Sequence, residues 1–200
     1  MDNLEAKVTG TATTTARPTR RPSHARNAGL QITPRFCPEE AIDPFETVEW
    51  DLRTATIKGE GGEVLFEQRD CEIPAAWSQL ATNVVANKYL YGEVGTPERE
   101  TGVRQLIHRV CRTIADWGQE DGYFAGAEAT EHFYRDLTWL CVHQHAAFNS
   151  PVWFNVGLYH QYGIKGAMCN WCWDPEKEDV VQPENPYEYP QGSACFIQSV

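Results

Sequence analysis

A repeated spacing of apolar residues constrains the fold of this chain more than any other feature. Between residues 96 and 117, apolar side chains return every three or four positions, at Val103, Leu106, Ile107, Val110, Ile114 and Trp117. This period places them on one face of a helix, which must be buried against other elements. Thr96-Pro97-Glu98 offers an N-cap residue, a proline suited to the first turn and an acidic residue, so we predict that the helix begins there.

Helical spacing also occurs before and after this segment. A first helix is predicted to begin at Pro74 and end near Gly92, with an inward face made of Trp77, Leu80, Ala81, Val84, Val85 and Tyr89. A third helix is predicted to begin at about Ala127 and to end at Ser150-Pro151, because proline disfavours further helix. Its inward face would consist of Phe133, Leu137, Leu140 and Cys141. Residues 118–126 contain three glycines and are expected to form a loop.

The segment before these helices predicts a β-hairpin. Residues 47–57 alternate apolar and polar side chains, residues 63–67 form a second extended run, and Gly59-Glu60-Gly61-Gly62 separates the two. The glycines provide the turn. No strand-to-helix context surrounds them, so we do not expect them to bind phosphate. Residues 37–157 are therefore expected to form a mainly α-helical domain with a small β-hairpin.

The two ends of the chain differ from this central domain. Residues 1–36 hold six Lys or Arg against two Asp or Glu and few apolar residues, which is typical of a disordered basic leader. The whole chain has a formal net charge of −11, and so acidic a body does not favour nucleic-acid binding. Residues 158–190 are expected to cross the surface, because their apolar pattern is weak and residues 174–190 are rich in Pro, Glu and Asp. Residues 191–200 predict a strand for which no partner follows.

Seven cysteines at irregular spacing fit reduced thiols better than a disulfide framework. Cys169-Asn170-Trp171-Cys172 has the C-x-x-C spacing of metal or redox sites, but the other two ligands of a zinc site are not evident.

His143 and His145 lie two positions apart and would point to different sides of a helix, so no metal ligand is assigned. Glu98 and Glu100 are expected in a solvated helix start. No acid/base pair is assigned to them.

The segment Phe148–Gly157, with the sequence FNSPVWFNVG, has a different character. An Asn-Ser-Pro at a helix end is followed by an apolar run, which we expect to be extended, and then by Asn-x-Gly. Such a turn can hold the Ser150 hydroxyl and backbone amides where an anionic group or a sugar hydroxyl could bind. An N-cap or a serine turn of purely structural role is the alternative.

Taken together, Phe148–Gly157 and Pro190–Val200, with the sequence PQGSACFIQSV, resemble the beginning of the catalytic subunit of the adenosylcobalamin-dependent (class II) ribonucleotide reductases. Three upstream segments resemble the helical N-terminal region of the long-chain members: Phe66–Arg69, Ala86–Tyr89 with Gly92, and Gly95–Glu100. The resemblance covers roughly residues 47–200, while about the first 36 residues match nothing in that family.

The resemblance implies a helical domain that leads into a ten-stranded α/β barrel, whose first strand would be residues 191–200. It also implies thiyl-radical reduction of ribonucleotides, leaning to diphosphates. Cys195 would be the first of two redox-active cysteines, since the reaction needs a weak acid and two electrons. Ser150, Ala194 and Cys195 match substrate-contacting positions. The partner cysteine, the radical cysteine and the adenosylcobalamin site would follow residue 200, so the 200-residue chain is expected to be an inactive fragment.

The expected partners are a ribonucleotide and a thioredoxin-like or other dithiol reductant, and a homodimer of the full-length protein is compatible with the resemblance. No run approaches the roughly 18 apolar residues that span a bilayer, and the N-terminus lacks the apolar core of a secretory signal. We therefore expect a cytoplasmic protein that binds neither membrane nor nucleic acid. The alternative function is a small cytosolic metal-binding or redox module that uses Cys169 and Cys172, with Cys195 incidental.

Overall fold

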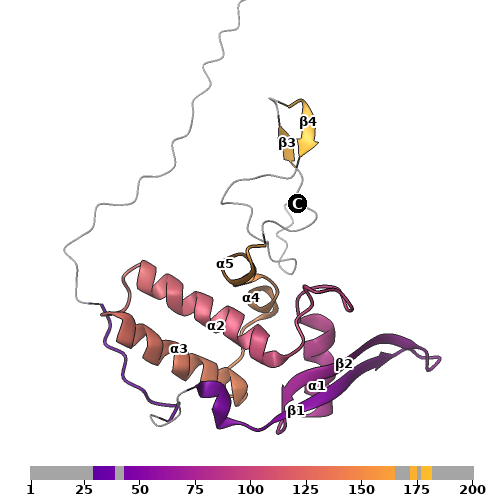
Figure 1. The fold of residues 1–200 in the computed structure, drawn as a ribbon, viewed down its shortest axis with the longest axis horizontal. Helices are drawn as coiled ribbons and strands as arrows, with labels where there is room; N and C mark the ends of the chain where they lie inside the picture. The colour runs from indigo at the N-terminus through magenta and orange to yellow at the C-terminus, as the bar shows by residue number, and fades with distance from the viewer. Residues whose placement is uncertain (1–28, 39–42, 165–171, 175–176, 182–200) are drawn as a thin grey trace, which may run out of the picture.

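The computed structural model describes residues 29–38, 43–164, 172–174 and 177–181. Figure 1 shows a long hairpin at one side, a helix across it, and two long helices that lie side by side. These are β1 (Trp50–Lys58) with β2 (Val64–Pro74), α1 (Gln79–Lys88), α2 (Val103–Glu120) and α3 (Ala127–Val142). Shorter elements complete the described fold: η1 (Pro44–Thr47), α4 (Ser150–Asn155), α5 (Leu158–Tyr162), β3 (Cys172–Asp174) and β4 (Asp179–Val181). The predicted helical domain with a small hairpin is confirmed.

The hairpin is antiparallel, as predicted, but its second strand is longer than its sequence pattern indicated. Trp50 pairs with Pro74 at one end and Lys58 with Val64 at the other, with an irregular register near Arg53 and Ala55. Pro74 was predicted to open a helix and instead ends β2. A turn follows it, closed by the hydrogen bond from Trp77 N to Pro74 O. Ser78 then caps α1, accepting from Ala81 N at 3.1 Å.

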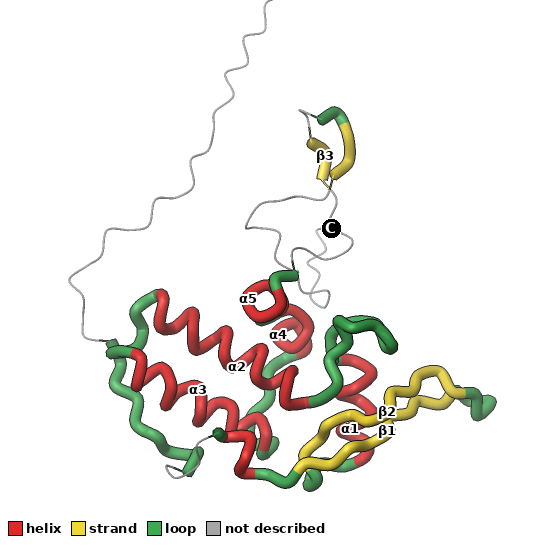
Figure 2. The backbone as a smooth tube through the Cα atoms, viewed as in Figure 1, coloured by secondary structure: helices red, strands yellow, loops and turns green. Residues whose placement is uncertain are grey.

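The predicted inward face of α1 is wrong in part. Thr82 and Ala86 are fully buried, whereas Leu80 is 73% exposed and Val84 is 41% exposed. The helix packs on the hairpin (Figure 2), and its fully buried residues are the small Thr82 and Ala86. Val85 and Tyr89 of the predicted face are partly buried against the core.

The second helix begins later than predicted, at Val103 instead of near Thr96. Residues 101–102 are extended because they pair with β2: Glu72 N donates to Thr101 O at 3.0 Å, and Glu72 and Gly102 form a β-bridge. A Cβ atom at Gly102 would lie 2.6 Å from the Cβ of Glu72, so glycine permits this approach. The predicted face of α2 is confirmed at Val103, Leu106, Ile107 and Val110, which are buried, whereas Ile114 is partly buried and Trp117 is 37% exposed.

The third helix ends at Val142, before the predicted break at Ser150-Pro151. Gln144 has a φ of 59°, a left-handed conformation that cannot continue a helix. Residues 29–38 run beside α3, where Asp136 accepts hydrogen bonds from the backbone N–H groups of Arg35, Phe36 and Cys37 at 2.9–3.0 Å. The expected leader thus includes residues that contact the domain. Residues 1–28 lie outside the described part.

The run after Ser150 is helical, not extended as expected. Pro151 occupies the first turn of α4, where its missing N–H and fixed φ are suited to a helix start. The expected surface excursion at 158–190 begins with α5, whose Leu158 is only 3% exposed. The strand predicted at 191–200 lies outside the described residues. None of the helices in the described part has the length and apolar character needed to cross a membrane.

Candidate functional site

Ser150 is the one predicted substrate-contacting residue that the structure describes. It opens α4 after Asn149, which occupies the N-cap position, and its side chain is half-buried. The Ser150 hydroxyl lies 3.1 Å from the hydroxyl of Tyr89, and either group could be the donor. If Tyr89 donates, the Ser150 proton is available to a phosphate or a sugar hydroxyl, which is the chemistry expected of this turn.

Tyr89 joins α1 to α4. It is the C-cap residue of α1, and its ring stacks on Phe154 with centroids 5.4 Å apart. A stacked aromatic pair contributes about 0.5–1.5 kcal/mol beyond its buried area. Because Tyr89 is held at both its ring and its hydroxyl, it limits the positions that the Ser150 side chain can take.

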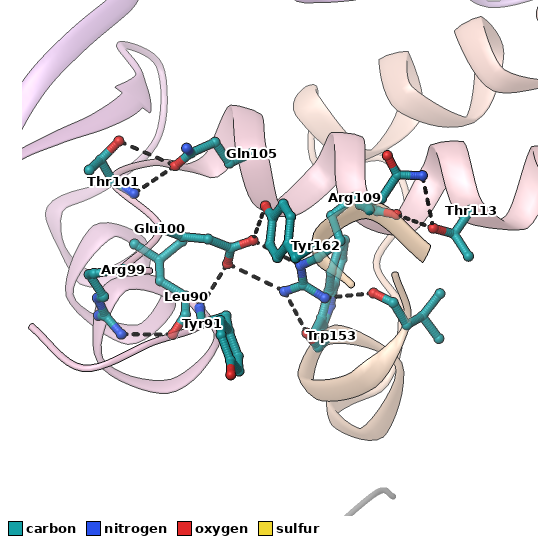
Figure 3. Close-up of polar contacts among 12 residues, drawn as sticks. Leu90, Tyr91, Arg99, Glu100, Thr101, Gln105, Arg109, Thr113, Trp153 and Tyr162 are labelled. Atoms are coloured by element: carbon teal, nitrogen blue, oxygen red, sulfur yellow. Dashed lines mark hydrogen bonds and ion pairs between the residues drawn. The ribbon is translucent and has the colours of Figure 1, made fainter. Parts of the chain in front are cut away.

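A buried ion pair contacts the backbone of α4 and its C-cap residue. Arg109 of α2 and Glu100 are 0% and 2% exposed, with Nε and Oε1 2.8 Å apart. The other guanidinium nitrogens donate to the carbonyl oxygens of Val156, at 2.6 Å, and Trp153, at 3.1 Å. Figure 3 shows the guanidinium between Glu100 and the backbone of α4. A single arginine therefore anchors the C-terminal end of the segment that Ser150 opens.

The carboxylate of Glu100 is also fully satisfied. It accepts hydrogen bonds from the Tyr162 hydroxyl of α5 at 2.8 Å and from Tyr91 N at 2.8 Å. Burial and the adjacent Glu100 raise the pKa of Tyr162 above its usual range, so the phenol keeps its proton and remains a donor. Glu100 thus ties together α2, α5 and the loop that follows α1 (Figure 3).

Gly157 completes the contact between this segment and α2. It has a φ of 88°, and a Cβ atom there would lie 2.4 Å from the carbonyl oxygen of Arg109. Both the conformation and the space require glycine. The Asn-x-Gly at the end of the sequence motif is therefore explained by packing against α2.

Tyr89 is also one of the residues that line an apolar groove. Its volume is about 300 Å³, and it runs between α1, α2, residues 144–148 and α4. Trp77, Val84, Val85, Tyr89, Phe148 and Trp153 form most of its wall. We call this feature the α1 groove. Because Tyr89 both lines it and contacts Ser150, the groove opens beside the predicted substrate-contacting serine.

Ala194, Cys195 and Cys169 lie outside the described residues, and of Cys172 only its place in β3 is described. Four further cysteines, at 37, 71, 111 and 141, are free and buried. In the described part of the chain, no group of three or more His, Cys, Asp or Glu side chains could hold a metal ion.

Sequence reasoning missed the residues that support Ser150. Glu100 was expected in solvent and is 2% exposed, because Arg109 and Tyr162 bind its carboxylate. A signal was present: Arg109 lies three residues after Leu106 and one before Val110, so a charge sits at the edge of the apolar face of α2. A charged residue so close to a buried face needs a partner, but the sequence does not identify which acid supplies it.

Comparisons with known proteins agree with the resemblance of the motifs. A family model described as class II vitamin B12-dependent ribonucleotide reductase matches residues 51–144. A vitamin B12-dependent ribonucleotide reductase of Rhodopirellula baltica is 66% identical over 174 residues, which cover 86% of this chain and 17% of that protein. Proteins of the same name from Streptomyces clavuligerus and Bradyrhizobium diazoefficiens are 41% and 31% identical, over 96% and 78% of this chain. The chain spans 17% of the first two relatives and 15% of the third.

Proposed function

We propose that this chain, which belongs to the class II, vitamin B12-dependent ribonucleotide reductases, forms the N-terminal part of an enzyme. The complete enzyme reduces ribonucleotides to deoxyribonucleotides. The observation that carries this proposal is the 66% identity over most of the chain to a reductase of that name. The same comparisons favour the reductase over a separate metal or redox module built on Cys169 and Cys172.

Cys195 is proposed as one of two cysteines that supply the electrons. In the overall reaction a ribonucleotide and two thiols give a deoxyribonucleotide, water and a disulfide. The 2′ hydroxyl leaves as water, the substrate gains two electrons, and the two sulfurs lose them in forming one S–S bond. A small dithiol or a thioredoxin-like protein then reduces the disulfide. The second cysteine, the radical-bearing cysteine and the other strands of the ten-stranded barrel, which would begin at residues 191–200, are proposed to lie beyond residue 200.

Ser150 is proposed to contact the ribonucleotide together with the backbone at Ala194 and Cys195. The support for this role is its half-buried hydroxyl, which Tyr89 contacts at 3.1 Å, at the start of a segment that Arg109 anchors. A serine held in this way can bind a phosphate or a ribose hydroxyl without first losing side-chain freedom. A diphosphate is the substrate we favour, since the upstream motifs resemble those of the long-chain members.

Adenosylcobalamin, when bound, would supply the radical that starts the reaction. The described residues do not fit this cofactor. A cavity of about 400 Å³, lined by Asp43, Arg104, His108, Glu131 and Tyr134 among others, would suit a ligand no larger than a small drug. We therefore place the cobalamin site outside the described residues and derive no step through it. We also propose a cytoplasmic location, a homodimer of the complete enzyme, and no binding to membranes or nucleic acids.

The test uses the complete reductase that contains this chain. With adenosylcobalamin and a dithiol, we expect it to convert ribonucleoside diphosphates to deoxyribonucleotides faster than triphosphates. Cys195→Ser should abolish multiple turnover, while the matched variant Cys172→Ser should retain it. Ser150→Ala should raise KM by about tenfold, the loss of one hydrogen bond to a charged group. Undiminished turnover by the Cys195→Ser enzyme would overturn the assignment of this cysteine.

The 200-residue chain alone should show no turnover under the same conditions. It contains only one member of the proposed dithiol pair and no radical site. Deoxyribonucleotide formation by the purified chain, with adenosylcobalamin and a dithiol present, would contradict the proposed division of the active site.

A further inference from the structure

Two histidines lie together at the C-terminal end of α3. His143 and His145 were expected to point to different sides of a helix, but α3 ends at Val142, and Gln144 between them has a φ of 59°. Their rings are nearly parallel, with an interplanar angle of 15° and centroids 6.3 Å apart. The expectation was wrong because it assumed that the helix continues through both residues.

Both imidazole rings stack on the indole of Trp139. The centroid of His143 lies 4.2 Å from that of Trp139, and the centroid of His145 lies 5.3 Å from it. Rings on opposite faces of one indole are two layers apart, about 7 Å or more at the usual contact distance. The separation of 6.3 Å between the two imidazoles therefore places them side by side on one face. An ion between two rings in one layer can bind a nitrogen of each.

The hydrogen bonds of His143 determine which of its nitrogens can bind an ion. The Thr47 hydroxyl donates its single proton to Pro44 O at 2.7 Å. It must therefore accept from His143 Nε2, which lies 2.9 Å away. A neutral imidazole with its proton on Nε2 has a lone pair on Nδ1. Metal-binding histidines are held in the same way, because the second ring N–H donates to a neighbouring acceptor.

We propose that His143 and His145 bind one divalent transition-metal ion of the kind that prefers imidazole nitrogen, Cu²⁺ or Ni²⁺, with water as the remaining ligands. An imidazole nitrogen lies about 2 Å from a bound ion and roughly 1 Å from its own ring centroid, so two rings that share an ion have centroids up to about 6 Å apart. The observed separation is 6.3 Å. His145 is exposed, so its ring can turn to adjust this distance.

The surroundings of the pair suit a cation. The last turn of α3 has no basic residue, and the negative end of the helix dipole favours positive charge there. Burial, and then His145, lower the pKa of His143, so its ring is neutral and can bind metal at neutral pH. Cu²⁺ and Ni²⁺ accept nitrogen and water ligands in one plane and bind such ligands more tightly than Mn²⁺ or Fe²⁺. Ca²⁺ and Mg²⁺ prefer oxygen ligands and should not bind.

Calorimetric titration of the 200-residue chain with Ni²⁺ tests the site. Ni²⁺ is the probe because thiols reduce Cu²⁺. Every sample carries Cys169→Ser and Cys172→Ser, so that the C-x-x-C spacing cannot supply the ligands. We expect one Ni²⁺ per chain. His143→Ala and His145→Ala should each weaken binding by at least about tenfold, because one of the two protein ligands is lost.

The matched control is His160→Ala. His160 also contacts a tryptophan, Trp117, with ring centroids 5.1 Å apart, and its replacement should leave the Ni²⁺ affinity unchanged. Thr47→Val removes the hydroxyl that accepts from His143 Nε2 and should weaken binding by about tenfold. Ni²⁺ should also quench part of the tryptophan fluorescence, and Trp139→Phe should remove this quenching.

Three results would overturn the proposal. They are no Ni²⁺ binding once Cys169 and Cys172 are replaced, undiminished affinity in His145→Ala, and an equal loss of affinity in His160→Ala. His145 is exposed, so its replacement should keep the far-ultraviolet circular dichroism of the parent and tests the site without unfolding the chain. The titration needs neither nucleotide nor cobalamin, so its outcome is independent of ribonucleotide reduction by the complete enzyme.

Discussion

At the scale of single residues, Arg109 has the largest structural role near the candidate site. Its guanidinium is fully buried, pairs with Glu100 and donates to two carbonyl oxygens of the Ser150 segment. A buried pair of this kind need not add net stability compared with apolar residues. Its role is to determine where α4 lies, because the guanidinium donates to Glu100 and, at the same time, to the carbonyl oxygens of Trp153 and Val156.

Removing this arginine should be costly. We expect Arg109→Met to lower the free energy of unfolding by about 3–5 kcal/mol, because it leaves the Glu100 carboxylate buried without its countercharge. The matched variant Arg104→Met removes a 3.2 Å pair with Glu72, in which both side chains are about one-third exposed, and should cost about 1 kcal/mol. Urea unfolding followed by tryptophan fluorescence measures both. Equal losses would contradict a special role for the buried pair.

Gly157 offers a second test at this scale. Gly157→Ala places a Cβ atom against the Arg109 backbone and in a left-handed conformation with φ of 88°. Gly62→Ala has nearly the same conformation, φ of 85°, with no atom within 4 Å of the new Cβ. Gly62→Ala should cost about 1–2 kcal/mol from the conformation alone. Gly157→Ala should cost about 1–3 kcal/mol more from overpacking. Thermal and urea unfolding should show this difference.

At the scale of elements, residues 29–38 depend on α3 for their position. Asp136 accepts from three consecutive backbone N–H groups, those of Arg35, Phe36 and Cys37. Phe36 stacks on Trp139 of the same helix, with centroids 6.4 Å apart. A short segment with no regular structure of its own is thereby held by one carboxylate and one aromatic contact.

Asp136→Ala should release this segment while leaving the helices folded. Hydrogen bonds to a charged group each contribute about 1.5–3 kcal/mol, so we expect the amides of Arg35, Phe36 and Cys37 to exchange at least about tenfold faster. Hydrogen–deuterium exchange with mass spectrometry measures this. The control is Glu131→Ala. Glu131 lies on α3, as Asp136 does, and its exposed carboxylate pairs with Arg112 of α2. This variant should leave the exchange of residues 29–38 unchanged. If both variants release the segment, general weakening of α3 is the cause instead.

At the scale of the whole molecule, two histidines link stability to pH. Burial lowers the pKa of His143, with a further contribution from the nearby His145. Burial and then Arg112 lower the pKa of His108. Below the usual histidine pKa of about 6.5, the unfolded chain binds protons that the folded chain does not. The free energy of unfolding therefore falls as the pH drops from about 6.5 toward the folded-state pKa values.

Urea unfolding at several pH values between 8 and 5.5 checks this direction. We expect a smaller decline in the double variant His108→Gln, His143→Gln, because glutamine does not titrate. Nuclear magnetic resonance titration of the imidazole protons gives the folded-state pKa values directly, and both should lie below those of a denatured reference. A stability that rises as the pH falls through this range would contradict the assignment.

The sequence alone was sufficient for the existence of the hairpin and the three longer helices and for the family. Alternation around Gly59–Gly62 predicted the hairpin, and the three- and four-residue spacing predicted α2 and its buried face, because both depend on residues near one another in the chain. The motifs around Ser150 and Cys195 indicated the reductase family, and the comparisons bear this out. The roles proposed for Ser150, Ala194 and Cys195 remain predictions.

Only the tertiary structure decided where elements begin and what supports the site. The start of α2 at Val103 depends on pairing between Gly102 and Glu72, and the burial of Glu100 depends on Arg109, nine residues away, and Tyr162, sixty-two residues away. In α1, Thr82 and Ala86 are buried while Leu80 and Val84 are exposed, and the spacing of apolar residues did not indicate this choice of face. Such contacts join distant parts of the chain and have no periodic signature. Local patterns therefore predicted the elements, while the pairing of buried charges and the choice of packing face required the folded molecule.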